Sequence, residues 1–344
     1  SRPGAPQAPP GPRAWRPRRR GPGRMQAEEG PESGYARFCR MLRHPSAKPL
    51  VARAQQFVVG FEAGLPREEA AGRVHRFLSK AEGWMLSEAV VFAAEADDEG
   101  RANATEGLEK FLLSRLHPKV FAATAAERAL DERLRRRVAG LSWVELGHLG
   151  IPPLEPTLLP RAVSELQSID NYKAPRDKLV CILNACRVIT DILRRTHAAE
   201  AGVRPLSADD FLPLLIYCII RANPARLHSN TEYLAAFRHP SRLVGEDAYF
   251  VTTLQSAKEF LANAGPDAFE VAPEEYRLLC EAALAGLPEA PAEEPRRVLF
   301  EREALAYQVP APAPAGHRAG DWRKVVFRGL CQVVAGSSDL SIRL

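Results

Sequence analysis

The segment SADDFLPLLIY, residues 207–217, places two adjacent acidic residues directly before a long apolar run. Ser207 fits the N-cap position of a helix, and Asp210 follows three residues later, as in a capping box with aspartate in place of glutamate. The apolar run continues to Ile220 and covers nearly the whole circumference of the helix, which predicts a central, buried helix. We therefore expect this helix to hold its first turn, with Asp209, rigidly at a surface.

Asp209 itself has two interpretations. Acidic residues in the first turn of a helix are stabilised by the helix dipole, so a capping role explains Asp210 and by itself also Asp209. The other interpretation is that the Asp209 carboxylate competes with a phosphate for a group that normally binds the phosphate. Residues 223–261 bear on this choice, because a break at Asn223–Pro224 and a turn at Gly245 predict that further helix ends lie nearby.

The composition is that of an ordinary globular protein, with 344 residues of which 46% are hydrophobic and 26% charged. No run approaches the roughly 20 apolar residues of a membrane span, and the N-terminus has no apolar core of a signal peptide. Six cysteines lack CxxC or Cys/His ligand spacing, so we expect reduced, mostly buried thiols of an intracellular protein and no metal site. They are Cys39, Cys181, Cys186, Cys218, Cys280 and Cys331.

The basic charge is concentrated in one tail. Residues 1–24 hold seven arginines and no acidic residue, while the whole chain has a formal net charge of +5, so the remainder is close to neutral. The tail could bind anionic lipid or nucleic acid without specificity, act as a targeting segment, or lie upstream of a start at Met25. Its composition favours the last two interpretations, and we expect residues 1–32 to be a disordered Pro/Arg-rich tail.

The rest of the chain is helical in pattern. Apolar residues recur at three- and four-residue spacing, and no alternating strand pattern of useful length occurs, so the fold class is predicted to be all-α. We expect a helical bundle over 33–123, a second multi-helix domain over 124–270, and a C-terminal helix with a Pro-rich, poorly ordered tail over 271–344. Within the bundle, EADDEGRANATEG (95–107) is interpreted as a solvated loop around Asp97 and Asp98, and a helix is expected to end before Pro118. The segment 321–336 is a short helix or strand of unassigned place.

Signatures of covalent catalysis are absent. The chain has no phosphate loop of the GxxxxGK[ST] type, no GxGxxG, no HExxH and no GxSxG. His228–Ser229 and His239–Pro240–Ser241 place histidines beside serines, but nucleophile–base pairs are rarely sequence neighbours. We expect no covalent chemistry, no cofactor and no bound metal.

Four segments closely resemble the catalytic core of the Vps-nine domain, the exchange-factor domain of Rabex-type proteins. They are SADDFLPLLIY (207–217), NPARLHSNTEYL (223–234), PSRLVGEDAYFVTTLQSAKEF (240–260) and IDNYKAPRDKLVCILNACRVI (169–189). The segment GLEKFLLSRLHPKVFA (107–122) resembles part of the helical bundle that precedes this domain. The resemblance covers residues 33–270 and is strongest to plant and algal members.

The resemblance implies an N-terminal bundle packed on a Vps-nine domain, and a guanine nucleotide exchange factor for Rab-five-class GTPases. It implies that Asp209 is the acidic finger and that Tyr249 acts beside it. The implied GTPase-binding residues are Pro213, Asn223, Pro224, Leu227, Asn230 and Thr252. Four positions depart from the family pattern without touching the acid or the phenol, so we expect activity to survive: Ala225, Ala248, Val251 and Thr253.

In the mechanism that the resemblance implies, Asp209 enters the nucleotide site, repels the phosphates and pairs with the lysine that they vacate. Apolar residues of the core helices, with Pro213, Leu215, Ile219 and Leu227 as candidates, are expected to form a groove for the GTPase. The partner is a Rab-five-class GTPase in its GDP-bound and nucleotide-free states, and no specific nucleic acid is expected. The implied setting is the cytoplasm with peripheral recruitment to endosomal membranes, in endocytosis, vesicle-mediated transport and vacuolar protein sorting.

Three other functions stay open from the sequence. The chain could be a GTPase-binding scaffold without exchange activity, which the effect of Asp209 on nucleotide release distinguishes. It could be an adaptor for nucleic acid or lipid that acts through the Arg-rich tail, which predicts salt-dependent binding that is lost without residues 1–24. A hydrolase that depends on His228 is the weakest of the three.

Overall fold

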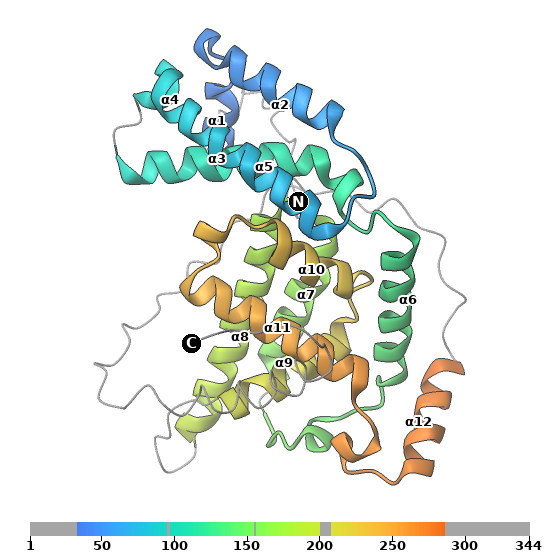
Figure 1. The fold of residues 1–344 in the computed structure, drawn as a ribbon. Helices are drawn as coiled ribbons and strands as arrows, with labels where there is room; N and C mark the ends of the chain where they lie inside the picture. Colours follow the sequence, from blue (N-terminus) through green and yellow to red (C-terminus); the bar gives the residue numbers. More distant parts are fainter. Residues whose placement is uncertain (1–32, 95–96, 155, 200–207, 286–344) are drawn as a thin grey trace, which may run out of the picture. The chain divides into compact units, whose positions relative to one another are not determined.

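The computed structural model describes residues 33–94, 97–154, 156–199 and 208–285, and those from Gly34 onward belong to one compact unit. These residues form α-helices and short 3-10 helices without a β-strand, which confirms the all-α prediction (Figure 1). Among them, no helix is long and apolar enough to cross a membrane. The predictions for residues 1–32, for Cys331 and for the segment 321–336 lie outside the described residues.

The first five helices enclose one hydrophobic cluster, which we call the bundle core. The largest fully buried side chains in it include Phe38, Leu78, Met85 and Leu108. The helices are α1 (Gly34–Met41), α2 (Lys48–Gly60), α3 (Arg67–Glu88), α4 (Val90–Ala93) and α5 (Asp98–Val120).

Helix α5 is longer at both ends than the sequence suggested. The predicted loop 95–107 is wrong from residue 98 onward, because Asp97 is the N-cap of α5 and its carboxylate accepts a hydrogen bond of 2.7 Å from the Gly100 amide. The acidic residues that suggested a solvated loop are those that stabilise a helix N-terminus. The helix also continues through Pro118 to Val120, although the proline removes the backbone hydrogen bond to the Ser114 carbonyl and its ring crowds that group.

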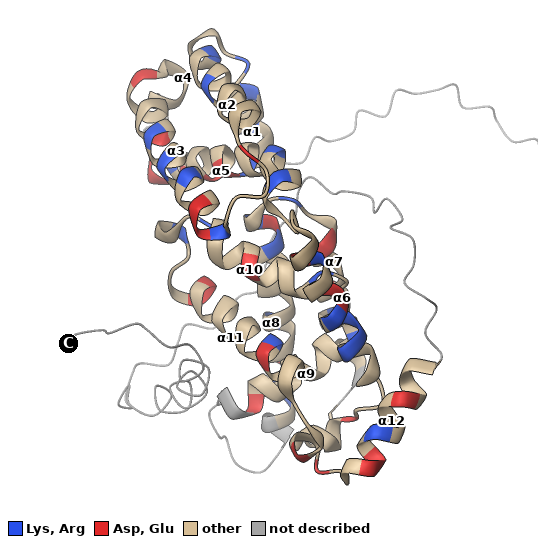
Figure 2. Ribbon diagram, turned by 45° about the vertical axis from the view of Figure 1, so that its right-hand side comes forward, with Lys and Arg blue, Asp and Glu red and all other residues tan. Residues whose placement is uncertain are grey.

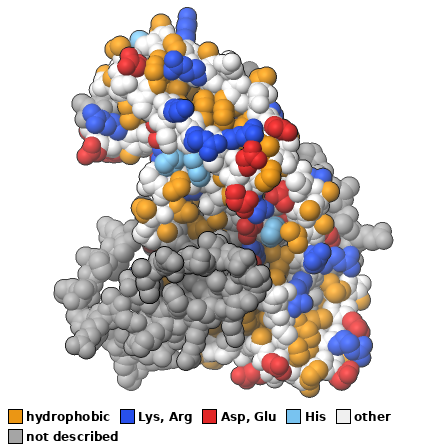
Figure 3. Space-filling model, viewed as in Figure 1, with side chains coloured by type: hydrophobic (Ala, Val, Ile, Leu, Met, Phe, Trp, Pro, Cys, Tyr) orange, Lys and Arg blue, Asp and Glu red, His pale blue; other side chains and the backbone are white. Residues whose placement is uncertain are grey.

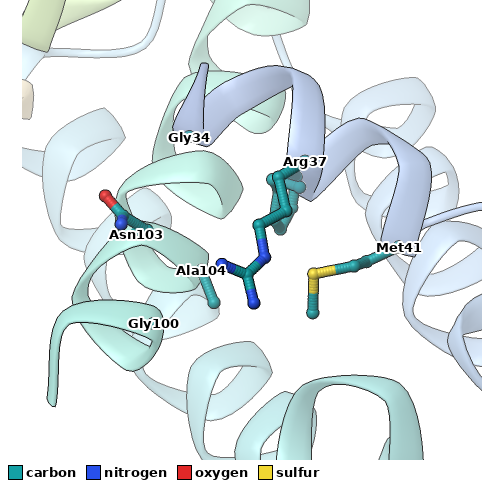
Figure 4. Close-up of a pocket in the computed structure, with 7 residues that line it drawn as sticks. Gly34, Arg37, Met41, Gly100, Asn103 and Ala104 are labelled. Carbon is teal, nitrogen blue, oxygen red and sulfur yellow. The ribbon is translucent and has the colours of Figure 1, made fainter. Parts of the chain in front are cut away.

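Helices α1 and α5 are in close contact at Gly107. A Cβ atom on Gly107 would lie 2.3 Å from Cγ of Phe38, a side chain that is 1% exposed and contacts the rings of Phe92 and Phe111. Beside this contact, α1 and α5 leave a pocket about the size of one water molecule, which the Arg37 side chain crosses (Figure 4). The pocket is too small to suggest a ligand site.

Gly107→Ala is expected to lower the free energy of unfolding by about 1–3 kcal/mol, the usual cost of overpacking a dense core. Urea denaturation of the full chain measures this effect. Gly83→Ala in α3 is the matched control, because a Cβ on Gly83 meets nothing within 4 Å. That change is expected to stabilise the protein by up to about 1 kcal/mol through helix propensity. Equal effects of the two substitutions would contradict the close α1–α5 contact.

The later helices enclose a second hydrophobic cluster, which we call the domain core. Helices α8, α9 and α11 pack against one another in it (Figure 1). Helix α9 has no charge between its ends (Figure 2), and its Leu214, Leu215 and Ile219 are fully buried, as expected of a central helix. The helices are α6 (Ala125–Gly140), α7 (Leu159–Ser168), α8 (Pro175–Ala199), α9 (Ala208–Ala222), α10 (Leu227–Phe237), α11 (Gly245–Asn263) and α12 (Pro273–Ala285).

Short 3-10 helices occupy the links between these elements: Pro45–Ala47, Leu146–Leu149, Pro156–Leu158, Ile169–Asn171, Pro240–Arg242 and Pro266–Phe269. Helix α10 belongs to both cores, because Tyr233 and Phe237 pack in the bundle core whereas Leu227 and Leu234 pack in the domain core. The predicted boundary between residues 123 and 124 falls in the link from α5 to α6, and the division of the chain into domains stays a prediction.

His117 lies where the two cores meet. Its ring stacks on Phe121 with centroids 4.4 Å apart and meets Tyr233 edge to face, and its Nε2 atom is buried without a hydrogen-bond partner. Burial, reinforced by the positive charge of Lys178, lowers the pKa of His117 to about 3. The folded protein therefore keeps this ring neutral at pH values where the unfolded chain binds a proton.

Between pH 6.5 and about 3, the unfolded chain binds a proton at His117 that the folded protein does not, so the stability that this site provides above pH 6.5 is lost as the pH falls. His117→Phe removes the titration and keeps the ring stacking. When the pH falls from 7.5 to 5, the free energy of unfolding of the unmodified protein should decrease by about 2 kcal/mol more than that of the variant. Urea denaturation at the two pH values measures this, and a pH-independent difference would contradict it.

Candidate functional site

The first turns of α9 and α11 lie together. The rings of Phe211 in α9 and Phe250 in α11 are 5.7 Å apart between centroids, and both side chains are buried. Asp209 precedes Phe211 by two residues in the first turn of α9, and Tyr249 directly precedes Phe250. This aromatic contact therefore brings the backbones of Asp209 and Tyr249 to the same end of the helix pair. The side chain of Asp209, and all of the predicted cap Ser207, lie outside what the structure describes.

Pro213 lies one turn after Asp209 on the same face of α9. A proline has no N–H, so the carbonyl group of Asp209 loses the hydrogen bond that residue 213 would donate in a regular helix. The first turn of α9 is therefore bonded less tightly than the rest. Further along this face, Leu212, Pro213 and Tyr217 are half-buried and form a partly exposed apolar stripe that begins at the acid.

The start of α11 presents apolar surface to solvent. Val244 is 62% exposed and Tyr249 is 41% exposed, and Gly245 between them has a φ of 57°, which favours glycine. Thr252 lies one turn after Tyr249 on the same face and is half-buried. Its hydroxyl group donates to the Ala248 carbonyl at 2.9 Å, so its oxygen remains able to accept a hydrogen bond from a partner.

Charged groups flank this surface. Glu246 lies 3.5 Å from a guanidinium nitrogen of Arg187 in α8, and the neighbouring Asp247 is half-buried. Burial raises the pKa of Asp247 even though the positive charge of Arg238 favours its ionised form. Sequence reasoning did not single out Arg187 or Val244. A lone valine before a glycine turn and an arginine within an apolar helix gave no local signal, because only the packing of α8 against α11 shows their place.

The remaining predicted residues lie at the other end of α9, about 20 Å from Asp209 along the helix at 1.5 Å per residue. Asn223 takes a positive φ of 39° and ends the helix, and Pro224 is buried behind it. Asn230 is fully buried, and its amide group donates to Asp170 at 2.7 Å. These residues build the turn between α9 and α10.

Lys178 completes this buried network. Its ammonium group donates to Asn230 Oδ1 at 2.6 Å and to the Ile169 carbonyl at 3.0 Å, and it lies over the ring of Phe121. Burial lowers the pKa of Lys178 to about 8, which the charge of Asp170 only partly offsets. The network joins α8 to the 3-10 helix Ile169–Asn171 before it and to α10, which is a structural role.

The expected apolar groove is not formed by the residues that we named for it. Leu215 and Ile219 are 0% exposed and Leu227 is 4% exposed, because all three face the domain core. A helix that is apolar all round does not indicate which side chains remain at the surface, and here only Pro213 of the four is partly exposed. A direct GTPase contact of Leu227 or Asn230 stays a prediction that their burial does not support.

The histidine–serine neighbours have structural partners. Ser229 donates to the Asp131 carboxylate at 2.6 Å and thereby joins α10 to α6. In His239–Pro240–Ser241 the ring nitrogen caps a 3-10 helix by accepting from the Ser241 amide, and His44–Pro45–Ser46 repeats the same cap elsewhere in the chain. A repeated cap favours a structural role over a catalytic one.

Within the described ranges, no group of three or more His, Cys, Asp or Glu side chains could hold a metal ion. None of the five cysteines in that part of the chain forms a disulfide. Three of them, Cys181, Cys186 and Cys218, are buried.

Comparison with known proteins assigns these helices to a family. The family model described as "Vacuolar sorting protein 9 (VPS9) domain" matches residues 159–266, which run from the start of α7 through α11. Vacuolar protein sorting-associated protein 9A of Arabidopsis thaliana is 37% identical over 257 residues, which cover 73% of this chain and 49% of that protein. Vacuolar protein sorting-associated protein vps901 of Schizosaccharomyces pombe is 28% identical over 296 residues, or 79% of this chain and 49% of that protein.

The Rab5 GDP/GTP exchange factor of Homo sapiens is 33% identical over 176 residues, which cover 49% of this chain and 35% of that protein. The chain thus spans about half the length, or less, of these relatives. The match to the VPS9 family model begins at the first residue of α7, and it includes the two helix starts that carry Asp209 and Tyr249. The chain therefore contains a VPS9 domain, built from α7 to α11, as its resemblance to Rabex-type and plant proteins implied.

Proposed function

We propose that this chain is a guanine nucleotide exchange factor for Rab GTPases of the Rab5 class. The observation that carries the proposal is the Phe211–Phe250 contact, which joins the acidic first turn of α9 to the exposed Tyr249 of α11. The VPS9 domain and the similarity to a Rab5 GDP/GTP exchange factor support the same activity. Similarity to two vacuolar sorting proteins supports a role in endosomal and vacuolar trafficking, with peripheral recruitment to endosomal membranes.

The proposed mechanism makes and breaks no covalent bond. A small GTPase holds GDP through backbone N–H groups, a lysine of its phosphate loop and Mg²⁺. The Asp209 carboxylate enters this site, repels the phosphates, disturbs the Mg²⁺ site and forms a charge-assisted contact with the vacated lysine. Tyr249 holds the phosphate loop or steadies the acid with its hydroxyl group. Release follows because the exchange factor binds the nucleotide-free GTPase better than the GDP-bound one.

The apolar part of the GTPase contact is assigned to the apolar side chains near the starts of α9 and α11 that are at least partly exposed. The stripe of Leu212, Pro213 and Tyr217 on α9 and the exposed Val244 before α11 offer apolar surface near the starts of both helices. Thr252 adds a hydrogen-bond acceptor on the α11 side. The less tightly bonded first turn before Pro213 lets Asp209 adjust as it enters the nucleotide site.

The test is the release of fluorescent GDP from a panel of purified Rab GTPases, with the full chain present in substoichiometric amounts. Each exchange factor molecule should release nucleotide from many molecules of a Rab5-class GTPase, and a Ras-class GTPase should serve as the unresponsive control. If the chain binds a Rab5-class GTPase tightly without accelerating release, it is a scaffold and the proposal is wrong.

A further inference from the structure

One buried carboxylate of the bundle receives three hydrogen bonds from the link between α10 and α11. Glu109 in α5 is 1% exposed. It accepts from a guanidinium nitrogen of Arg238 at 2.7 Å, from the His239 amide at 3.2 Å and from a guanidinium nitrogen of Arg242 at 2.7 Å. The three donors lie about 130 residues further along the chain and precede α11 directly.

Both arginines are paired a second time. Arg238, which is 4% exposed, forms a two-pronged pair with Glu106, one turn before Glu109 in α5, at 2.6 Å for each nitrogen. Arg242 also pairs with Glu82 of α3. On the face of the molecule drawn in Figure 3, histidine side chains lie near basic and acidic side chains at the surface. Burial by itself would raise the pKa of Glu106, but the hydrogen bond and charge of Arg238 hold it below its usual range.

The anchored link ends at the proposed site. Arg242 precedes Tyr249 by seven residues, and the segment between them contains Gly245, whose positive φ turns the backbone at the first residue of α11. On its other side the first turn of α11 makes a weak polar contact, the Arg187–Glu246 ion pair at 3.5 Å with Glu246 exposed. The buried Phe250 then packs on Phe211 of α9. The buried charge cluster is therefore the firm polar attachment of the residues that precede Tyr249, because breaking a buried charge cluster costs far more than breaking a surface pair.

We propose that Glu109 is a positioning residue for nucleotide exchange: through Arg238 and Arg242 it fixes the start of α11 and with it Tyr249. This inference rests on the proposed function. It gives the bundle a part in nucleotide release, although no bundle residue belongs to the α9–α11 surface. If the cluster only stabilised the fold, breaking it would lower the free energy of unfolding and leave the start of α11 unchanged.

The test compares two substitutions of a bridging arginine in the full chain. Arg242→Gln removes one of the three donors and leaves Glu109 paired with Arg238. Arg67→Gln is the matched control, because Arg67 of α3 also bridges two glutamates, Glu127 of α6 and Glu232 of α10, but contacts nothing in the link. Glu109→Gln is the stronger variant and is used if urea denaturation shows that it folds.

Two readouts separate positioning from stability. Hydrogen exchange of the amides of residues 241–250 should become about tenfold faster in Arg242→Gln, with α9 unchanged, and should stay unaltered in Arg67→Gln. The maximal rate of GDP release should fall by about tenfold in Arg242→Gln, with less than a twofold change in the exchange-factor concentration that gives half of that rate.

Unchanged hydrogen exchange over residues 241–250 in Arg242→Gln would overturn the inference, and so would an equal loss of release rate in Arg67→Gln. If the unmodified protein releases no nucleotide, the proposed function fails instead. Hydrogen exchange then decides by itself whether Glu109 fixes the start of α11, so the two failures are distinguishable.

Discussion

Asp209→Asn is expected to lower the rate of GDP release from a Rab5-class GTPase by at least about 30-fold. The amide keeps the size of the side chain but removes the charge that repels the phosphates and attracts the lysine of the phosphate loop. Loss of one partner of a desolvated charge pair costs about 2 kcal/mol or more, and about 1.4 kcal/mol corresponds to a factor of ten. The measurement is fluorescent GDP release at several concentrations of the exchange factor.

Asp210→Asn is the matched control for this prediction. Both acidic residues lie in the first turn of α9 and both interact with the helix dipole, so loss of this dipole interaction affects the two variants alike. We expect Asp210→Asn to retain most of the release rate. If the two substitutions lower the rate equally and lower the free energy of unfolding equally, the acids serve the helix end and the acidic-finger mechanism is wrong.

Asp177→Ala is expected to lower the free energy of unfolding by about 3–5 kcal/mol. Asp177 in α8 pairs with Lys110 in α5 at 3.0 Å, and the two side chains are 2% and 3% exposed. Lys110 also lies over the ring of Tyr35. Removing the aspartate leaves an ammonium group buried without its counter-charge, which costs far more than the loss of an exposed ion pair.

Urea denaturation of Asp177→Ala measures this loss, and the double substitution Lys110→Met with Asp177→Leu is its control. Replacing both charges by apolar side chains of similar size removes the desolvation cost together with the attraction, so most of the lost stability should return. A loss below about 1 kcal/mol for the single variant would show that water reaches Lys110 and that the pair is not buried in solution.

Much of the candidate site followed from local sequence. The periodicity of residues 207–222 predicted a central apolar helix, and Leu214 and Leu215 are fully buried in it. The segments around Asp209 and Tyr249 were enough to indicate the VPS9 domain, since they are long and depend on residue type rather than on packing. Errors came where local signals compete. The acidic run at Asp97 and Asp98 was interpreted as a loop, although the same residues cap α5.

The groove shows the limit of helical periodicity. Leu215, Ile219 and Leu227 have the same apolar character as Leu212, but they are buried and Leu212 is partly exposed. For the residues of α9, the difference arises from the positions of α7, α8 and α11 around this helix. A sequence in which every face of a helix is apolar carries no information about which face a neighbouring helix leaves open.

The amino-acid sequence by itself determined the all-α class, the central position of α9 and the family of residues 159–266, because helix periodicity and motif identity are properties of neighbouring residues. The tertiary structure decided that α9 and α11 begin side by side, and that Glu109 receives Arg238 from 129 residues away. It also decided that Lys110 meets Asp177 across 67 residues. Charges can be buried only with a partner, and which distant residues become partners depends on how the helices pack.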